Sequence, residues 1–94
     1  MLAEDPDDAF TRYALALELK GKGQAAEALA ELEGLIERQP EYLASYYQCG
    51  GLLHAEDRSE RAIEVIRQGI ERAAAAGDAH TKGELEDLLE DVED

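Results

Sequence analysis

The side chains with the most reactive chemistry in this chain belong to one cysteine and two histidines. Cys49 could act as a nucleophile or a metal ligand, with His54 beside it as a base or a second ligand. A separation of five residues, however, places two side chains on different faces of a helix. Cys49 also falls in an apolar helical stripe, where a small buried hydrophobe is the simpler interpretation. The pair therefore does not predict a reactive centre.

Other polar segments resemble ligand sites only in part. The Gly21-Lys22-Gly23 turn has neither the preceding strand nor the glycine spacing of a phosphate-binding loop. The acidic segment 84–94 spreads its carboxylates around a helix and lacks the loop glycine of an EF-hand calcium site. His80 fits a surface or inter-helix contact better than a metal ligand. We therefore expect no catalytic residue, no cofactor and no metal, and a protein that is not an enzyme.

The charge of the chain restricts its partners. It has 94 residues, with 23 acidic side chains, 9 lysines and arginines, and a formal net charge of -14. Such a surface repels the phosphates of nucleic acids and anionic lipids, so neither nucleic acid nor membrane is expected as a partner. No apolar run approaches the roughly 20 residues that cross a bilayer, and the first residues lack the features of a signal peptide. A cytoplasmic location is the expectation.

Apolar residues recur at spacings of three and four along most of the chain, which is the pattern of amphipathic helices. This pattern predicts five helices, near 9–20, 24–38, 43–55, 60–76 and 78–92. A glycine-rich turn, Pro40, the polar segment 56–59 and Gly77 separate them. We expect an all-α fold. In the first helix the expected apolar stripe consists of Leu15, Ala16 and Leu19.

The chain also repeats itself. A shift of 34 residues aligns 7–40 with 41–74 without a gap, and six positions are identical. Three of these are Tyr13 with Tyr47, Leu19 with Leu53 and Ala28 with Ala62, and the other three form the run 36–38 with 70–72. The matches fall at helical core spacings, which indicates two copies of one helix pair.

A gapless helix-turn-helix repeat of 34 residues resembles the tetratricopeptide repeat. The residues that carry the resemblance are the small residues where paired helices approach, the alanines and large apolar residues of the second helices, the repeat-ending prolines and an early aromatic: Ala16, Gly50, Ala28, Ala62, Leu32, Ile66, Pro6, Pro40 and Tyr46. The chain departs from the family pattern at Arg12, Cys49, Gly69 and Ala74. The resemblance implies a right-handed superhelix of antiparallel helix pairs.

The repeats suggest one domain over residues 1–94, with a first repeat at about 7–40, a second at about 41–76 and a capping helix at about 78–92. A third repeat in strict register would put His80, Gly83, Glu84 and Asp87 at core positions. The apolar stripe of the last helix begins only at Leu85. We therefore expect this helix to act as a solvating cap.

In the family that this chain resembles, the first helix of each pair lines a concave groove. Twelve positions carried over to this sequence contain no acidic residue, although about three would be expected by chance. We name seven of them the inner strip, with apolar anchors followed by polar contacts: Phe10, Tyr13, Leu17, Tyr47, Lys20, Gln48 and His54. The carboxylate clamp found in some grooves of the family is missing here, because Tyr13, Leu17 and Gln48 occupy the matching positions.

These features predict a non-catalytic protein-protein interaction module that binds a peptide or protein segment, helical or extended, on the inner strip. The alternative is a homo-oligomeric assembly unit, such as a homodimer, that buries the same face by self-association. The acidic residues are expected mainly on the second helices, the turns and the cap, outside the groove. With only three lysines, this acid excess also suggests a protein kept hydrated in high salt, and hence a halophilic source.

Overall fold

The computed structural model describes residues 8–94, which form five α-helices and, over this range, no strand. The all-α prediction is confirmed, and each helix lies within a few residues of its expected position. Pro6 and the expected start of the first repeat at Asp7 lie outside the described residues. The helices are α1 (Ala9–Gly21), α2 (Ala25–Arg38), α3 (Ala44–Ala55), α4 (Ser59–Ala76) and α5 (Ala79–Glu93).

Local signals set several helix ends. The Asp8 side chain accepts a hydrogen bond from the Thr11 backbone N–H at 3.0 Å, and Asp78 does the same for Thr81 at 3.0 Å. Hydrogen bonds from the backbone and side chain of Thr81 lower the pKa of the Asp78 carboxyl below its ordinary value. Gly77 ends α4 with a φ of 73°, the left-handed conformation that glycine adopts at low cost.

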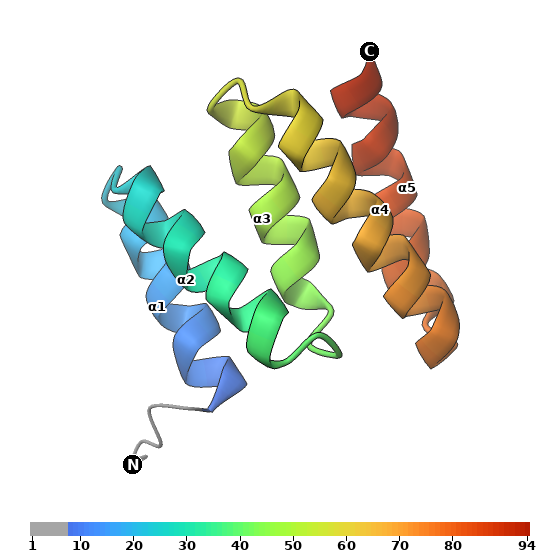
Figure 1. The fold of residues 1–94 in the computed structure, drawn as a ribbon, viewed down its shortest axis with the longest axis horizontal. Helices are drawn as coiled ribbons and strands as arrows, with labels where there is room; N and C mark the ends of the chain where they lie inside the picture. Colours follow the sequence, from blue (N-terminus) through green and yellow to red (C-terminus); the bar gives the residue numbers. More distant parts are fainter. Residues whose placement is uncertain (1–7) are drawn as a thin grey trace.

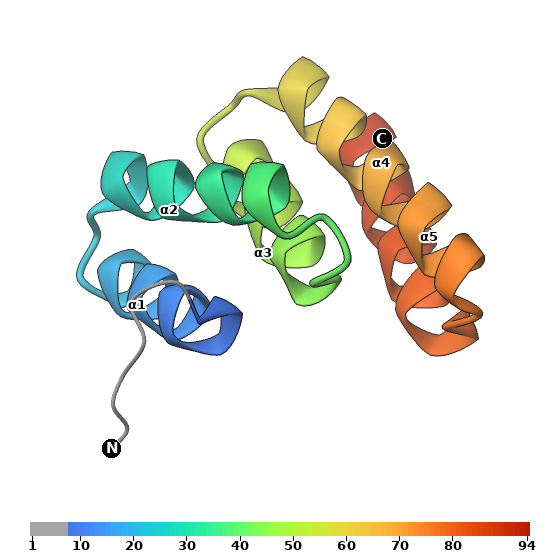
Figure 2. The ribbon, with the colours of Figure 1, turned by 60° about the horizontal axis from the view of Figure 1, so that its bottom comes forward.

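The helices pack in two layers. Helix α2 packs on α1 and α3, and α4 packs on α3 and α5, as Figure 1 shows. Figure 2 shows α2 and α4 forming the outer layer over α1, α3 and α5, which form the inner layer. Consecutive helices run in opposite directions, so the helices of the inner layer are parallel to one another.

A single apolar core fills the space between the layers. Each outer helix turns one apolar stripe inward. Tyr46 of α3 lies within this core and has no exposed surface. The Tyr46 hydroxyl donates a hydrogen bond to the Pro40 carbonyl oxygen at 2.7 Å, so the buried phenol is satisfied. Leu15 was expected in the apolar stripe of its helix but is 40% exposed.

Two glycines allow α3 and α4 to approach closely. A Cβ atom on Gly50 would lie 2.5 Å from Ile66 Cγ1 on α4. A Cβ atom on Gly69 would lie 2.6 Å from Tyr46 Cβ on α3 and 3.0 Å from Leu85 Cδ1 on α5. These separations are far shorter than ordinary van der Waals contact, so neither position accepts a larger residue without a shift. The departure from the family's alanine at Gly69 therefore has a steric cause.

We expect Gly69→Ala to lower the free energy of unfolding by about 1–3 kcal/mol, because the added methyl group overpacks the junction of three helices. The matched control is Gly83→Ala on α5, where nothing beyond the local helix backbone lies within 4 Å of the new Cβ. There the better helix propensity of alanine should stabilise the protein by up to about 1 kcal/mol. Urea unfolding of the two variants measures both effects. Equal stability of Gly69→Ala and the parent chain would contradict the packing described above.

Candidate functional site

The inner strip lies on the two inner helices, with Phe10, Tyr13, Leu17 and Lys20 on α1 and Tyr47, Gln48 and His54 on α3. The two aromatic side chains with the most free surface are Phe10, which is 66% exposed, and Tyr47, which is 41% exposed. Leu17 is half-buried beside them. The strip therefore presents apolar surface that no described part of the chain covers.

Two residues of the strip meet across the inner layer. The Lys20 ammonium group donates a hydrogen bond to Gln48 Oε1 at 3.1 Å, which joins α1 to α3. Since both side chains are at the surface, this contact fixes their positions more than it stabilises the fold. It also occupies one donor of the lysine on this face.

The structure assigns Tyr13 a partly internal role. Its ring packs against the ring of Tyr42, with centroids 5.6 Å apart and planes tilted by 60°. The side chain is half-buried against the core, so less of it is free for a partner than of Phe10 or Tyr47. Sequence reasoning missed Tyr42, which lies in the connection between α2 and α3, where helical periodicity gives no signal.

The remaining polar side chain of the strip, His54, is half-buried. Its Nδ1 atom is inside the protein and has no hydrogen-bond partner among residues 8–94. This nitrogen cannot contact a ligand on the surface. Any contribution of His54 to binding therefore comes from the remaining edge of the ring.

Cys49 is fully buried, as expected for a core position. Burial raises the pKa of its thiol from 9.0 to about 12, so the thiolate is scarce at neutral pH. In the described part of the chain, no group of three histidine, cysteine or carboxylate side chains lies close enough to hold a metal ion. Within the same range, no helix combines the length and apolar character that a membrane span requires.

The arrangement of α5 changes the expected distribution of charge. From the sequence we expected the acids of the last helix to lie away from the groove. In the structure α5 is beside α3 in the inner layer, and Leu88 Cδ2 lies 3.5 Å from the position of a Cβ on Gly50. On the other side of the helix, Glu93 Oε2 pairs with Arg67 Nη2 of α4 at 3.0 Å. The side of α5 next to Leu88 and away from Glu93 thus borders the inner strip.

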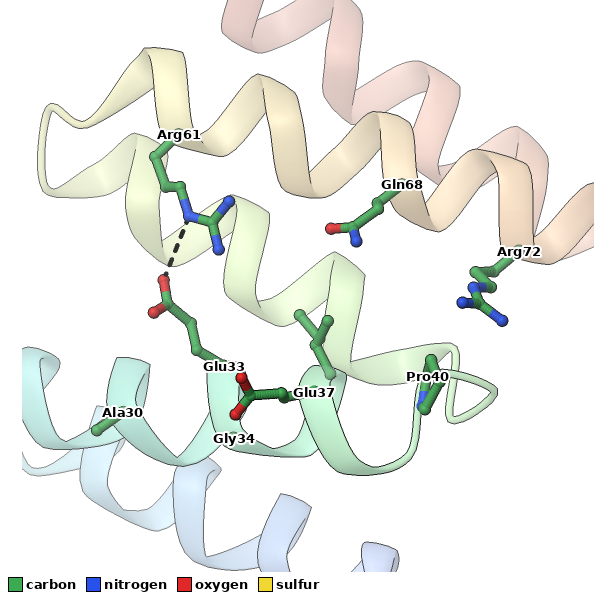
Figure 3. Close-up of a pocket in the computed structure, with 9 residues that line it drawn as sticks. Ala30, Glu33, Gly34, Glu37, Pro40, Arg61, Gln68 and Arg72 are labelled. Carbon is green, nitrogen blue, oxygen red and sulfur yellow. Dashed lines mark ion pairs between the residues drawn. The ribbon is translucent and has the colours of Figure 1, made fainter.

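A cleft of about 590 Å³ separates α2 from α4 on the outer face (Figure 3). Glu33 and Glu37 stand on the α2 wall, and Arg61 and Arg72 stand on the α4 wall. Arg61 Nε and Glu33 Oε2 lie 3.7 Å apart across one end, the ion pair drawn in Figure 3. No residue of the inner strip lines this cleft. Sequence reasoning missed it because it depends on the distance between two outer helices.

Antiparallel helix pairs in two layers define an α-helical repeat protein, and comparisons with known proteins identify the repeat. No profile of a known protein family matches the chain. The solution structure of a tetratricopeptide repeat domain protein from Salinibacter ruber superposes with a TM-score of 0.91 at 43% identity, over 96% of this chain and 91% of that one. A crystal structure of a tetratricopeptide repeat domain protein from the same organism gives a TM-score of 0.86 at 42% identity, over 92% and 97% of the two chains.

A TPR repeat-containing protein of Pseudomonas aeruginosa is 29% identical over 85 residues, which are 90% of this chain and 81% of that protein. The chain belongs to the tetratricopeptide repeat family. Its fold is in general that of a protein-interaction module, and proteins of this kind are generally non-catalytic scaffolds.

The raised pKa of Cys49 leads to a test of stability against pH. The unfolded thiol ionises near 9.0, whereas the folded thiol stays protonated until about pH 12. The folded state therefore binds more protons in this range, and the free energy of unfolding should fall as the pH rises above about 9. We expect the free energy of unfolding of Cys49→Ala, measured by urea unfolding, to fall less steeply with pH across the same range. If stability fell equally with pH in the two proteins, the buried thiol would not be its cause.

Proposed function

We propose that this protein is a non-catalytic interaction module that binds a peptide or protein segment on the inner strip. The observation that carries the proposal is the exposure of Phe10 and Tyr47 on a face where α1 and α3 present no carboxylate. Exposed apolar patches of this kind mark interaction sites more often than random surface does. We further propose that the protein acts in the cytoplasm, with a protein rather than a nucleic acid as its partner.

The side chains of the strip have different roles in the proposed binding. Phe10 and Tyr47 are the anchors, since burial of each large apolar side chain contributes on the order of 1.5–3 kcal/mol. Leu17 extends the apolar surface along α1, and Tyr13 supports it through the ring of Tyr42. Lys20, Gln48 and His54 edge the strip as polar contacts. Such a surface can accept a helix or an extended segment.

Self-association is the second candidate, and one observation favours it. Phe10, Ala14, Leu17 and Gly21 recur on α1 at the i, i+4, i+7, i+11 spacing of a helix-helix seam. All four are uncharged, and none is fully buried. Because the seam contains no carboxylate, two copies of the chain could pair through α1 as a homodimer.

One pair of substitutions tests the groove and separates the two candidates. Phe10→Ala/Tyr47→Ala removes the anchors without touching the core, and Leu15→Ala removes an exposed apolar side chain on another side of α1. We expect the double variant, but not the control, to lose at least tenfold in affinity for a partner captured from the source cytoplasm. Light scattering should show a monomer if recognition is the function. A dimer that the double variant dissociates would establish self-association instead, and an unchanged affinity in the double variant would remove the proposed site.

We also propose that the acid excess is an adaptation to high salt. The support is compositional: 23 acidic residues accompany only three lysines, and the carboxylates of α5 are mostly exposed. In molar salt, repulsion between such carboxylates is screened beyond about 3 Å. We expect the melting temperature to rise steeply between 0.1 and 2 M potassium chloride, in roughly the range where the Debye length falls from about 10 Å to below 3 Å. A flat dependence measured by circular dichroism would contradict the proposal.

A further inference from the structure

The inner strip and the neighbouring side of α5 form one continuous surface with two chemically different parts. The α1 and α3 part has apolar anchors with uncharged or basic side chains at their edge and no acid, whereas the neighbouring side of α5 is acidic. Glu84 and Asp91 flank Leu88 at spacings of four and three residues, and Asp87 lies next to them on the same side. All three carboxylates are exposed.

The orientation of this acidic stripe follows from the contacts of α5. Leu88 faces Gly50 of α3, and Glu93 pairs with Arg67 of α4 on the opposite side. Because a helix turns by 100° per residue, Glu84 and Asp91 lie on the side of Leu88 that faces away from Glu93. This side is continuous with the open face of α3, where Tyr47 is exposed.

We infer that the partner is a basic, amphipathic protein segment, which places apolar side chains on Phe10 and Tyr47 and lysine or arginine side chains against Glu84, Asp87 and Asp91. The inference rests on the proposed function, since it assigns the partner's chemistry at the same groove. A helical partner lying along α5 would match the stripe with basic residues at spacings of three and four.

Charge complementarity favours this occupant over an acidic or neutral one. Lys20, the one lysine or arginine of the inner strip, already donates a hydrogen bond to Gln48. At about 0.1 M salt, where the Debye length is about 10 Å, the net charge of -14 repels an acidic segment and attracts a basic one. Of the three carboxylates only Glu84 has an ion-pairing neighbour among residues 8–94, His80 at 3.3 Å, and that histidine is itself exposed.

Selection from a displayed library of random 16-residue peptides tests the inference, with four forms of the full chain as bait. The first is the parent chain. The second neutralises the stripe with Glu84→Gln, Asp87→Asn and Asp91→Asn. The third is the matched control, Glu27→Gln, Glu60→Gln and Glu71→Gln, which makes the same change in net charge at exposed sites on the outer layer. The fourth is Phe10→Ala/Tyr47→Ala.

We expect the parent chain and the outer-layer control to select peptides that combine apolar residues with a positive net charge. The stripe variant should keep the apolar preference and bind the best parent-selected peptide roughly tenfold more weakly, as measured by fluorescence anisotropy at 0.1 M salt. Neutral or acidic peptides from the parent chain, or an equal loss in the stripe variant and the outer-layer control, would overturn the basic-partner inference.

The fourth bait, Phe10→Ala/Tyr47→Ala, separates failure of the basic-partner inference from failure of the proposed binding at the inner strip. Peptides that depend on Phe10 and Tyr47 but not on the stripe would leave the proposed function standing and remove only the charge requirement. Peptides that bind Phe10→Ala/Tyr47→Ala as well as the parent chain would remove the groove, and the inference with it.

Discussion

The close approach of α3 and α4 at Gly50 and Gly69 is the constraint on which the rest of the structure depends. At Gly50 the backbone of α3 meets Ile66, and at Gly69 the backbone of α4 meets Tyr46 and Leu85. Because Leu85 belongs to α5, the second contact also sets the position of the last helix. With these helices in place, one side of α3 packs into the core and the opposite side, with Tyr47, stays exposed.

The distribution of charge around this framework fits the binding proposed at the inner face. The α1 and α3 surfaces there carry no acid, although the chain as a whole is strongly negative. Acidic residues lie on α5 at the edge of the same surface, so a partner bound there would meet apolar side chains in the centre and carboxylates to one side. The outer cleft between α2 and α4 has the opposite character, since charged side chains on both walls leave it polar, with one ion pair closing an end.

The helix pairs and most of the core could be predicted from the sequence, because the 34-residue repeat assigns equivalent roles to residues such as Ala28 and Ala62. The orientation of α5 could not, since that helix is out of register with the repeat and periodicity alone does not say which neighbour each side faces. The Tyr13 and Tyr42 contact and the outer cleft were missed for a related reason. Both depend on the spacing between elements, which a helical pattern within one element does not encode.

We propose that partners bind the inner face formed by α1, α3 and the edge of α5. A photoreactive phenylalanine analogue placed at Tyr47, and in a second sample at Gln68 in the outer cleft, tests it in cells of the source organism. Irradiation should yield a discrete crosslinked adduct from position 47 and none from position 68. An adduct from position 68 with none from position 47 would contradict the account and move the binding surface to the outer layer.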